Sequence, residues 1–581
     1  MRYLRMLTNA LVAGALSAAY VIVLVLLLNP SLPTAPRSLG PLVWSIGAYY
    51  TAGSASIAYL LLLLRRLFGR ASFSPAWMSV TVLAWLGSVT AGAGAGVFWL
   101  NIRSYALVLE ARMTTALAQG VIVLTAAAML FLIIALLQRY GGRRVVWAAW
   151  LTTIAVASVT VPLVLRGRGT PAPPVIRPAA AGRDVAAAAS ARVTVIAIEG
   201  GSLELIAAAA AEGRLPNIGR LLDTGATMHL ATLRPTSSEA VWAAISTGKL
   251  PQKNGIRSAA VYRLAGHPQN VPVQLLPDYC FASALIRSGI LEEERQTSAS
   301  LQATPLWTAL SRAGISVGLV NVPLTHPPPP VEGFVVSDGY ARMGPGGVTM
   351  DATHVSPHAI AHDVRSAATA ALGAGDGAIA ATLAVMPERH RGAARTDRML
   401  DAIGRALHLA HPTQVSVTRF ESPDTAGHYF LRYARPASFG DVSEEDRRRL
   451  GGVLEAHYAL VDEAVGRAVG GLGPDDLLFV ISGFGIEPLG IGKRILERLV
   501  GDSDVSGTHE AAPDGFLIAY GGQVARAGQL RRGSVVDVAP TLLYFLGLPI
   551  GRDMDGFARV DLFQSAFTGE RPMTFIPTYD R

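Results

Sequence analysis

Five long apolar runs in the first third of the chain constrain its fold more than any other feature. They cover residues of about 7–29, 41–64, 76–100, 116–137 and 145–165 of the 581. A helix needs about 20 apolar residues to cross a bilayer, and each run is long enough. The first run is too long for a signal-peptide core, and no clear small-residue cleavage site follows it. We therefore predict a transmembrane region of five helices over residues 1–166.

The arginines around these runs predict the direction in which the helices cross the membrane. Eight stand before the first run or in every second loop, namely Arg2, Arg5, Arg65, Arg66, Arg70, Arg139, Arg143 and Arg144. The alternate loops hold three, namely Arg37, Arg103 and Arg112. Because positive residues favour the cytoplasmic side, we expect a cytoplasmic N-terminus in the cytoplasmic membrane of a bacterial cell envelope. Five crossings then place everything after about residue 166 on the periplasmic or extracellular side.

The charge distribution and the cysteine content argue against a nucleic-acid partner and against a disulfide within the chain. The net charge is +8, but no basic stripe is interleaved with aromatic residues, so we expect no nucleic-acid partner. Cys280 is the only cysteine, so no disulfide can form within the chain. The sequence leaves the oligomeric state open.

The composition changes after the apolar runs. Residues 167–191 are rich in proline and alanine and predict a linker. Short β-branched runs then alternate with helical patterns, with strands expected at 193–198, 415–420, 477–482 and 516–520 and helices at 203–211 and 216–224. This alternation is typical of an α/β domain with a mostly parallel sheet covered by helices on both faces. We assign it to residues 192–570, with 340–412 as a helical cap or insertion and 571–581 as a tail.

Three side chains late in the chain have the character of metal ligands. Asp424 and His428 stand four residues apart in Ser-Pro-Asp-Thr-Ala-Gly-His, so both share one face if a helix begins there. His509 stands in Gly-Thr-His-Glu. One carboxylate and two imidazoles suit a divalent ion, zinc above all, with a fourth position open to substrate. Taken singly, Asp424 also fits a helix cap, and His428 a surface position.

Two further residues lie where such a domain places its chemistry. Glu199 follows the strand predicted at 193–198, and ligands bind beyond the carboxyl ends of parallel strands. Ser238 is the expected N-cap of a helix over 239–245. A helix start attracts phosphate, and a nearby metal would make the hydroxyl a nucleophile. The same position fits a plain helix cap, and Ser237 is nearly as good a candidate.

Five short motifs follow one another along residues 195–543. They are Val-Ile-Ala-Ile-Glu-Gly-Gly at 195–201, Gly-Arg-Leu-Pro-Asn-Ile at 213–218, Pro-Thr-Ser-Ser at 235–238, Asn-Val-Pro-Leu-Thr-His-Pro-Pro at 321–328 and Val-Val-Asp-Val-Ala-Pro-Thr-Leu-Leu at 535–543. With them, residues 193–565 resemble the alkaline phosphatase superfamily, in particular its type I phosphodiesterase/nucleotide pyrophosphatase branch. The resemblance implies two metal ions, often zinc, around a nucleophile at Ser238. It assigns one ion to Asp424, His428 and His509.

The chain departs from this family at the second metal ion. The family holds that ion with an Asp after the first strand, with the nucleophile and with an Asp-His pair after a later strand. Here Glu199 replaces the first Asp and can still act as a ligand or a general base. The pair falls on Gly483 and Phe484, which cannot coordinate through their side chains, and Asn254 replaces a common histidine. Three acids are candidate substitute ligands, namely Glu421, Glu487 and Glu510.

Three functions remain open from the sequence. The first is a membrane-anchored, outward-facing phosphoesterase or phosphodiesterase with an altered metal centre, acting on a lipid- or envelope-linked phosphoester. The second is a headgroup transferase, because lipoteichoic acid synthases and phosphoethanolamine transferases share the layout of five spans and an outer domain. The third is a non-catalytic metal-binding domain of the same fold. Metal content, phosphodiester turnover and headgroup transfer distinguish the three.

Overall fold

The computed structural model describes residues 1–32, 35–68, 75–141, 143–166, 191–267, 272–344, 347–526 and 532–580. The predicted linker at 167–191 lies outside these residues except for its last position. Contacts divide the chain into two compact units. We call Met1–Pro174 together with Ala260–Arg295 the membrane unit, and Val175–Ala259 together with Gln296–Arg581 the sheet unit.

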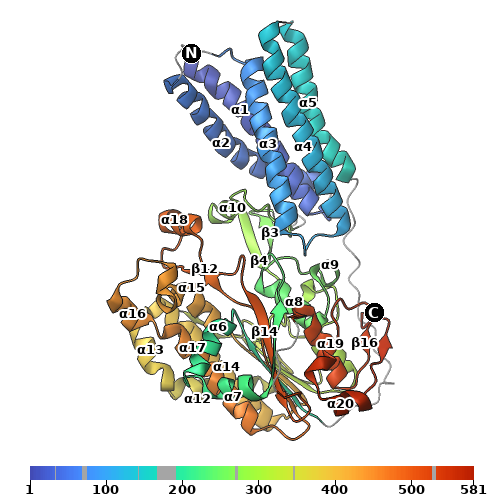
Figure 1. Cartoon of the computed structure of the whole chain (residues 1–581), viewed down its shortest axis with the longest axis vertical. Helices are drawn as coiled ribbons and strands as arrows, with labels where there is room; N and C mark the ends of the chain where they lie inside the picture. Colours follow the sequence, from blue (N-terminus) through green and yellow to red (C-terminus); the bar gives the residue numbers. More distant parts are fainter. Residues whose placement is uncertain are drawn as a thin grey trace. The chain divides into compact units, whose positions relative to one another are not determined.

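The membrane unit contains the five predicted spans as helices (Figure 1). They are α1 (Arg2–Leu28), α2 (Pro36–Phe68), α3 (Val80–Ser104), α4 (Ala111–Leu137) and α5 (Arg144–Arg166). All five are long and apolar enough to cross a membrane, as expected of a multi-pass membrane protein. Among the described residues, one bent pair of helices in the sheet unit, His358–Gly373 with Gly377–Val385, is comparably apolar.

The membrane unit also contains a segment that the sequence places between two parts of the sheet unit. This segment, residues 260–295, holds β3 (Ala260–Leu264), α10 (Ser283–Arg287) and β4 (Leu291–Arg295), and β3 pairs antiparallel with β4. We had assigned these residues to the α/β domain by sequence. Their apolar side chains instead share a core with the helices, as Leu275 and Leu291 illustrate.

Two buried asparagines at helix ends bind the backbone of this segment in both directions. Asn29, just after α1, donates to Leu275 O at 2.8 Å and accepts from Leu275 N at 2.9 Å. Asn101, in the last turn of α3, does the same with Asp278, at 3.1 and 2.8 Å. Buried amides need such partners, so these contacts fix the segment at the C-terminal ends of α1 and α3. That end of the membrane unit is therefore the one that carries residues 260–295.

The sheet unit is built on a nine-stranded sheet with the order β15-β2-β14-β11-β1-β10-β5-β6-β9. The strands are β1 (Val193–Ile198), β2 (Ala226–Ala231), β5 (Val317–Val320), β6 (Gly333–Val336), β9 (Val355–Ser356), β10 (Val415–Phe420), β11 (Leu477–Phe484), β14 (Asp514–Gly521) and β15 (Gly533–Ser534). Strand β1 lies parallel to both β10 and β11, and β5 and β6 continue the parallel run. Only β14 and β9 run antiparallel to their neighbours. The prediction of a mostly parallel sheet is confirmed.

Helices cover both faces of this sheet (Figure 1). Successive residues of a strand point to opposite faces, so Val195 and Ala197 of β1 pack in one core and Ile196 and Ile198 in another. The first core includes residues of α8 (Ser238–Thr247) and α19 (Val538–Phe545). The second includes residues of α6 (Leu203–Ala211), α7 (Pro216–Thr224), α15 (Ser422–Ala434) and α17 (Val453–Gly470). The layered α/β architecture is as expected.

The remaining elements are short or peripheral. The helices are α9 (Pro251–Asn254), α11 (Leu306–Arg312), α12 (Ala361–Gly373), α13 (Ala380–Val385), α14 (Glu388–Ala410), α16 (Glu444–Leu450), α18 (Ile491–Val500) and α20 (Ser565–Glu570). The strands are β7 (Ala341–Gly344), β8 (Gly347–Met350), β12 (Glu487–Pro488), β13 (Gly507–Thr508), β16 (Ile550–Gly551) and β17 (Phe575–Ile576).

Residues 340–412 are less helical than the sequence indicates. They begin with the antiparallel hairpin of β7 and β8 and continue into β9, which pairs with β6 of the central sheet. Only then do α12, α13 and α14 follow, and α14 packs against β5. The strands of this stretch are only two to four residues long, which is too short for a periodic pattern to reveal them within an alanine-rich sequence. This stretch is therefore integrated into the edge of the sheet.

Candidate active site

Parallel pairing brings the carboxyl ends of β1, β10 and β11 to the same edge of the sheet. Glu199 directly follows β1, Asp424 lies in the first turn after β10, and Gly483 and Phe484 end β11. Gly200 allows this edge to close, because a Cβ at its φ of +60° would lie 2.5 Å from Asp424 Oδ1. The candidate residues that follow separate strands are thus neighbours in space.

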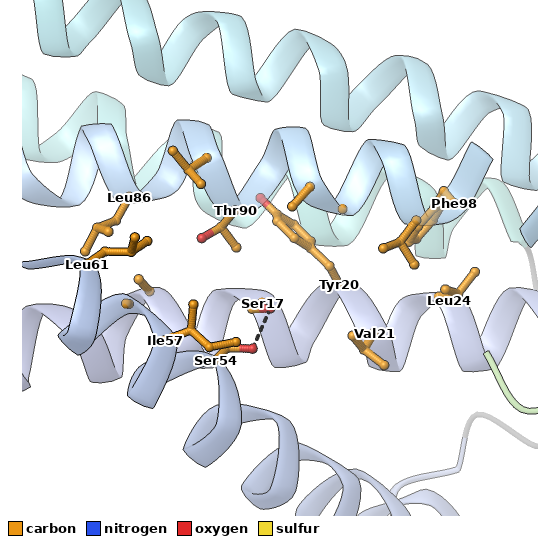
Figure 2. Close-up of a pocket in the computed structure, with 16 residues that line it drawn as sticks. Ser17, Tyr20, Val21, Leu24, Ser54, Ile57, Leu61, Leu86, Thr90 and Phe98 are labelled. Atoms are coloured by element: carbon orange, nitrogen blue, oxygen red, sulfur yellow. Dashed lines mark hydrogen bonds between the residues drawn. The ribbon is translucent and has the colours of Figure 1, made fainter. Parts of the chain in front are cut away.

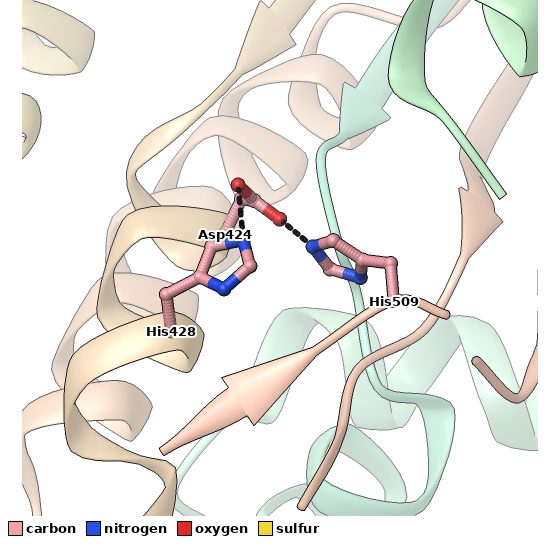
Figure 3. Close-up of side chains that lie close together, drawn as sticks. All are labelled: Asp424, His428 and His509. Carbon is pink, nitrogen blue, oxygen red and sulfur yellow. Dashed lines mark ion pairs between the residues drawn. The ribbon is translucent and has the colours of Figure 1, made fainter. Parts of the chain in front are cut away.

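Asp424, His428 and His509 converge at this edge (Figure 3). Asp424 and His428 share one face of α15, and His509 follows β13. The Oδ1 atom of Asp424 lies 2.6 Å from His509 Nε2, and its Oδ2 atom lies 3.5 Å from His428 Nε2. One ligand atom from each residue lies within 4.8 Å of the others. All three side chains are partly exposed, so a small molecule can reach them.

The ring nitrogens of both histidines are arranged as in metal ligands. His428 Nδ1 lies 2.9 Å from Gly507 O, and His509 Nδ1 lies 2.8 Å from Gly485 O. A carbonyl oxygen only accepts, so each Nδ1 carries a proton and donates it, which leaves a lone pair on Nε2 in the neutral ring. Within the described residues, neither His509 Nε2 nor Asp424 Oδ1 makes a hydrogen bond of good geometry. These features fit a divalent ion held by the three side chains.

The charges of these residues also favour a cation. Burial acts to raise the pKa of Asp424, but His509, His428 and Arg419 together hold that pKa below its usual value. Burial acts to lower the pKa of His509, but the neighbouring Asp424 carboxylate raises that pKa above its usual value. The carboxylate therefore stays ionised near neutral pH and presents a negative charge between the two imidazoles.

Ser238 is the first residue of α8, and Ser237 is the N-cap. The prediction that Ser238 caps this helix was therefore wrong by one position, because α8 begins before its first apolar residue. Ser237 makes no side-chain cap hydrogen bond, and within the described residues its buried hydroxyl has no partner. Ser238 lies close enough to Glu199 for its hydroxyl to lower the pKa of that carboxyl. Ser238 is thus the serine directed to the strand ends.

Glu199 is buried among polar partners that the sequence did not reveal. Its Oε2 atom accepts a hydrogen bond from Trp242 Nε1 at 2.7 Å and another from Arg419 Nη1 at 2.9 Å. Burial raises the pKa of Glu199, and the charge of Arg419 opposes that rise. Glu199 therefore forms a buried ion pair and lies beside Ser238 at the same time.

Arg419 lies at the centre of this arrangement. Its Nε atom donates to Asn321 O at 2.7 Å, and its Nη2 atom donates to Glu421 Oε2 at 3.0 Å. Burial acts to lower the pKa of Arg419, but Glu421 and Glu199 raise it above its usual value. Asn321 opens the motif at 321–328, so this motif helps to orient the guanidinium. The centre thus holds a fixed positive charge between two carboxylates.

The residues at the end of β11 do not fit a second metal ion. A Cβ on Gly483 would lie 2.4 Å from Val241 Cγ1 of α8, so no side chain can be added without moving that helix. Phe484 is 1% exposed, and its ring packs edge-on against His509 with centroids 4.8 Å apart. Helix α8 therefore lies against the strand where the family places an Asp-His pair. The three substitute ligands considered from sequence are engaged elsewhere. Glu421 binds Arg419, Glu487 accepts a hydrogen bond from Ala511 N, and Glu510 forms an ion pair with Lys493.

Sequence reasoning missed Arg419 and Trp242. A signal existed for Arg419, since a charged residue stands within the buried strand β10, where an unpaired charge would be costly. Nothing in the sequence singles out Trp242 from the other apolar residues of α8. The contacts of both residues with Glu199 join segments that are far apart in the chain, and only the fold reveals them.

The match to known proteins covers the same part of the chain. The family model described as Type I phosphodiesterase / nucleotide pyrophosphatase matches residues 193–536, more than half of the chain. Among solved structures, the chain is similar to murine ectonucleotide pyrophosphatase / phosphodiesterase 5, with 12% identity over 64% of this chain and 100% of that chain and a TM-score of 0.36. A comparison with curated proteins gives no match.

Proposed function

This chain belongs to the type I phosphodiesterase/nucleotide pyrophosphatase family and is a hydrolase of phosphoester bonds, and from this premise we propose how its centre works. We propose a metal-dependent phosphodiesterase that is anchored by its five helices and faces outward from the cytoplasmic membrane. The divalent ion, expected to be zinc, would be held by Asp424, His428 and His509. The observation that carries this proposal is the direction of the two imidazoles, which both turn Nε2 to Asp424 and donate Nδ1 to backbone carbonyls.

Ser238 is the proposed nucleophile. When bound, the ion supplies Lewis acidity toward a phosphoryl oxygen. The Ser238 hydroxyl attacks phosphorus, the bond from phosphorus to the leaving oxygen breaks, and water later releases the phosphoryl group from the serine. Helix α8 begins at Ser238, and the positive end of its dipole favours negatively charged phosphoryl oxygens at that end.

Glu199 is the proposed acceptor of the Ser238 proton. Its carboxylate lies beside the serine, and burial raises its pKa toward the range that suits a general base. Arg419 keeps a compensating positive charge next to this carboxylate throughout the reaction. In this proposal Arg419 takes over the charge that a second ion provides in two-metal members of the family, and the centre uses one ion only.

The substrate is proposed to be a phosphodiester linked to a lipid or to another component of the cell envelope. The five candidate membrane helices support this, because they would tether the sheet unit of the same chain to a membrane. The same helices also favour transfer of a phosphoryl headgroup as a second candidate function. Both reactions pass through a phosphorylated Ser238 and differ only in whether water or an alcohol removes the phosphoryl group.

The test uses the full-length protein in detergent. We expect it to release the leaving group from a chromogenic phosphodiester, to lose activity on treatment with a chelator and to regain it with zinc. Product analysis with a fluorescent phospholipid and a glycolipid acceptor separates the two functions, because transfer yields a labelled acceptor and hydrolysis yields a free headgroup. Absence of both products over a range of phosphodiesters would favour a non-catalytic domain.

A further inference from the structure

A cavity lies within the membrane unit between α1, α2 and α3 (Figure 2). Its volume is about 210 Å³, below the roughly 300–1,000 Å³ of pockets for drug-sized ligands. The side chains labelled in Figure 2 enter it from all three helices, with Tyr20 and Leu24 on α1, Ile57 on α2 and Phe98 on α3. Such a volume suits one narrow, elongated group.

The walls of this cavity offer no charge and few free polar atoms. None of its sixteen lining residues is Asp, Glu, Lys, Arg or His. The hydroxyl of Ser54 donates to Ser17 Oγ at 3.0 Å, so these two groups satisfy each other. The Tyr20 hydroxyl pairs with Ser158 Oγ of α5 at 2.8 Å, which leaves its ring as an apolar wall. A charged or strongly polar ligand would lose its hydration here without gaining partners.

The depth of the cavity identifies one side of the bilayer. At 1.5 Å per residue, the lining residues of α1 run from about 8 Å (Leu24) to about 24 Å (Ala13) from Asn29. Asn29 marks the end of the membrane unit that holds residues 260–295. Because the hydrocarbon core is about 30 Å thick, the cavity starts in the leaflet at that end and reaches past the midplane.

We propose that this cavity is a binding site for one acyl chain of a phospholipid from the leaflet at the Asn29 end. Phospholipid chains are the solvent of this part of the protein, and the uncharged walls match an uncharged chain. Exposed apolar side chains at its rim, such as Ile57 and Val89, continue the surface toward the bilayer. The site would hold a lipid beside the membrane end that bears residues 260–295, and it does not depend on phosphoester chemistry in the sheet unit.

The test is photo-crosslinking of the full-length protein in phosphatidylglycerol and phosphatidylethanolamine nanodiscs that contain a phospholipid with a photoactivatable acyl chain. Peptide mass spectrometry should find the label concentrated on α1 between Ser17 and Leu24 and on α3 between Thr90 and Phe98. Ala93→Phe fills the cavity from an exposed position and should reduce that labelling several-fold. Ile57→Trp should do so from a second helix. Ala126→Phe, at an exposed position of α4 away from the cavity, is the matched control.

Two outcomes would overturn the proposal. Labelling spread evenly over the exposed faces of all five helices, unchanged in Ala93→Phe and Ile57→Trp, would mean that lipid surrounds the protein without a defined site. Displacement of the label by a polyisoprenyl alcohol at low molar ratio, but not by excess phospholipid, would assign the cavity to an isoprenoid chain. Both variants should elute as the wild type does on size exclusion and retain the same metal content, which excludes misfolding as the cause of reduced labelling.

Discussion

Arg419 donates a hydrogen bond to Glu199 across 2.9 Å, and both side chains are almost fully buried, at 7% and 3% exposure. The resemblance to two-metal members of the family implies an Asp ligand of the second metal ion at the position of Glu199. Here a guanidinium neutralises the carboxylate, and Trp242 donates to the same oxygen. The three residues that differ from the family pattern, Glu199, Gly483 and Phe484, therefore all belong to a centre in which a guanidinium stands in place of the second metal ion.

Replacing Arg419 with lysine tests this rearrangement. A lysine keeps the positive charge but cannot reach Glu199, Glu421 and Asn321 together, because it lacks the planar fork of the guanidinium. We expect Arg419→Lys to lower phosphodiester turnover by about 10²-fold, the cost of removing one positioned electrostatic group. The exposed Arg405→Lys is the control and should leave turnover unchanged. Metal content should stay the same in both variants, and full activity in Arg419→Lys would contradict its role.

Restoring the family's Asp-His pair should fail. In Gly483→Asp with Phe484→His, the new Asp side chain would collide with Val241 and Ile245 of α8. Burying a polar imidazole in place of the Phe484 ring adds a further cost of about 1–3 kcal/mol. We expect a lower melting temperature and no second ion by elemental analysis. Uptake of two ions per chain would show that the second site is only dormant.

The three ligands should each be necessary for the ion. Asp424→Ala, His428→Ala and His509→Ala each remove one of three protein ligands, and affinity depends on ligand number and geometry. We expect elemental analysis to find one divalent ion per chain in the wild type and none after dialysis of each variant. His229→Ala, at an exposed position of β2, is the control. An equal ion content in all four variants would place the metal elsewhere.

Much of this could be predicted from the sequence, and the rest depends on contacts between distant segments. The strand at 193–198, the pair Asp424 and His428 and the five spans are local patterns, which periodicity and motif spacing reveal. The pairing of Arg419 with Glu199 joins residues that are 220 positions apart. The hydrogen bond from Asn29 to Leu275 O joins residues that are 246 positions apart. Contacts of this kind make residues 260–295 part of the membrane unit, whereas the sequence predicted them in the α/β domain. No local pattern encodes these contacts.

The buried His457 predicts a pH dependence of stability. Burial lowers its pKa from 6.5 to about 4, and within the described residues neither ring nitrogen has a hydrogen-bond partner. Between these two values the unfolded chain binds a proton at this residue that the folded chain does not. Stability should therefore fall as the pH drops from about 6.5 to about 4, by about 3 kcal/mol from this group.

His457→Leu isolates this contribution, because all other titrating groups are shared with the wild type. The melting temperature of the wild type, measured for the full-length protein in detergent, should fall more steeply between pH 6.5 and 4 than that of the variant. Parallel curves for the two proteins would mean that His457 does not titrate as its burial indicates.

The most direct measurement is the turnover of a chromogenic phosphodiester by Ser238→Ala, Ser237→Ala and the wild type, each loaded with zinc. We expect Ser238→Ala to lose at least about 10³-fold in turnover, since removing a covalent nucleophile leaves only binding and electrostatic effects. Ser237→Ala should retain most of the activity, because its hydroxyl makes no cap hydrogen bond. Mass spectrometry of the wild type quenched during turnover should find Ser238 esterified to the phosphoryl group that still carries the second ester substituent of the substrate. Equal turnover in Ser238→Ala and the wild type would contradict a serine-based mechanism in this centre.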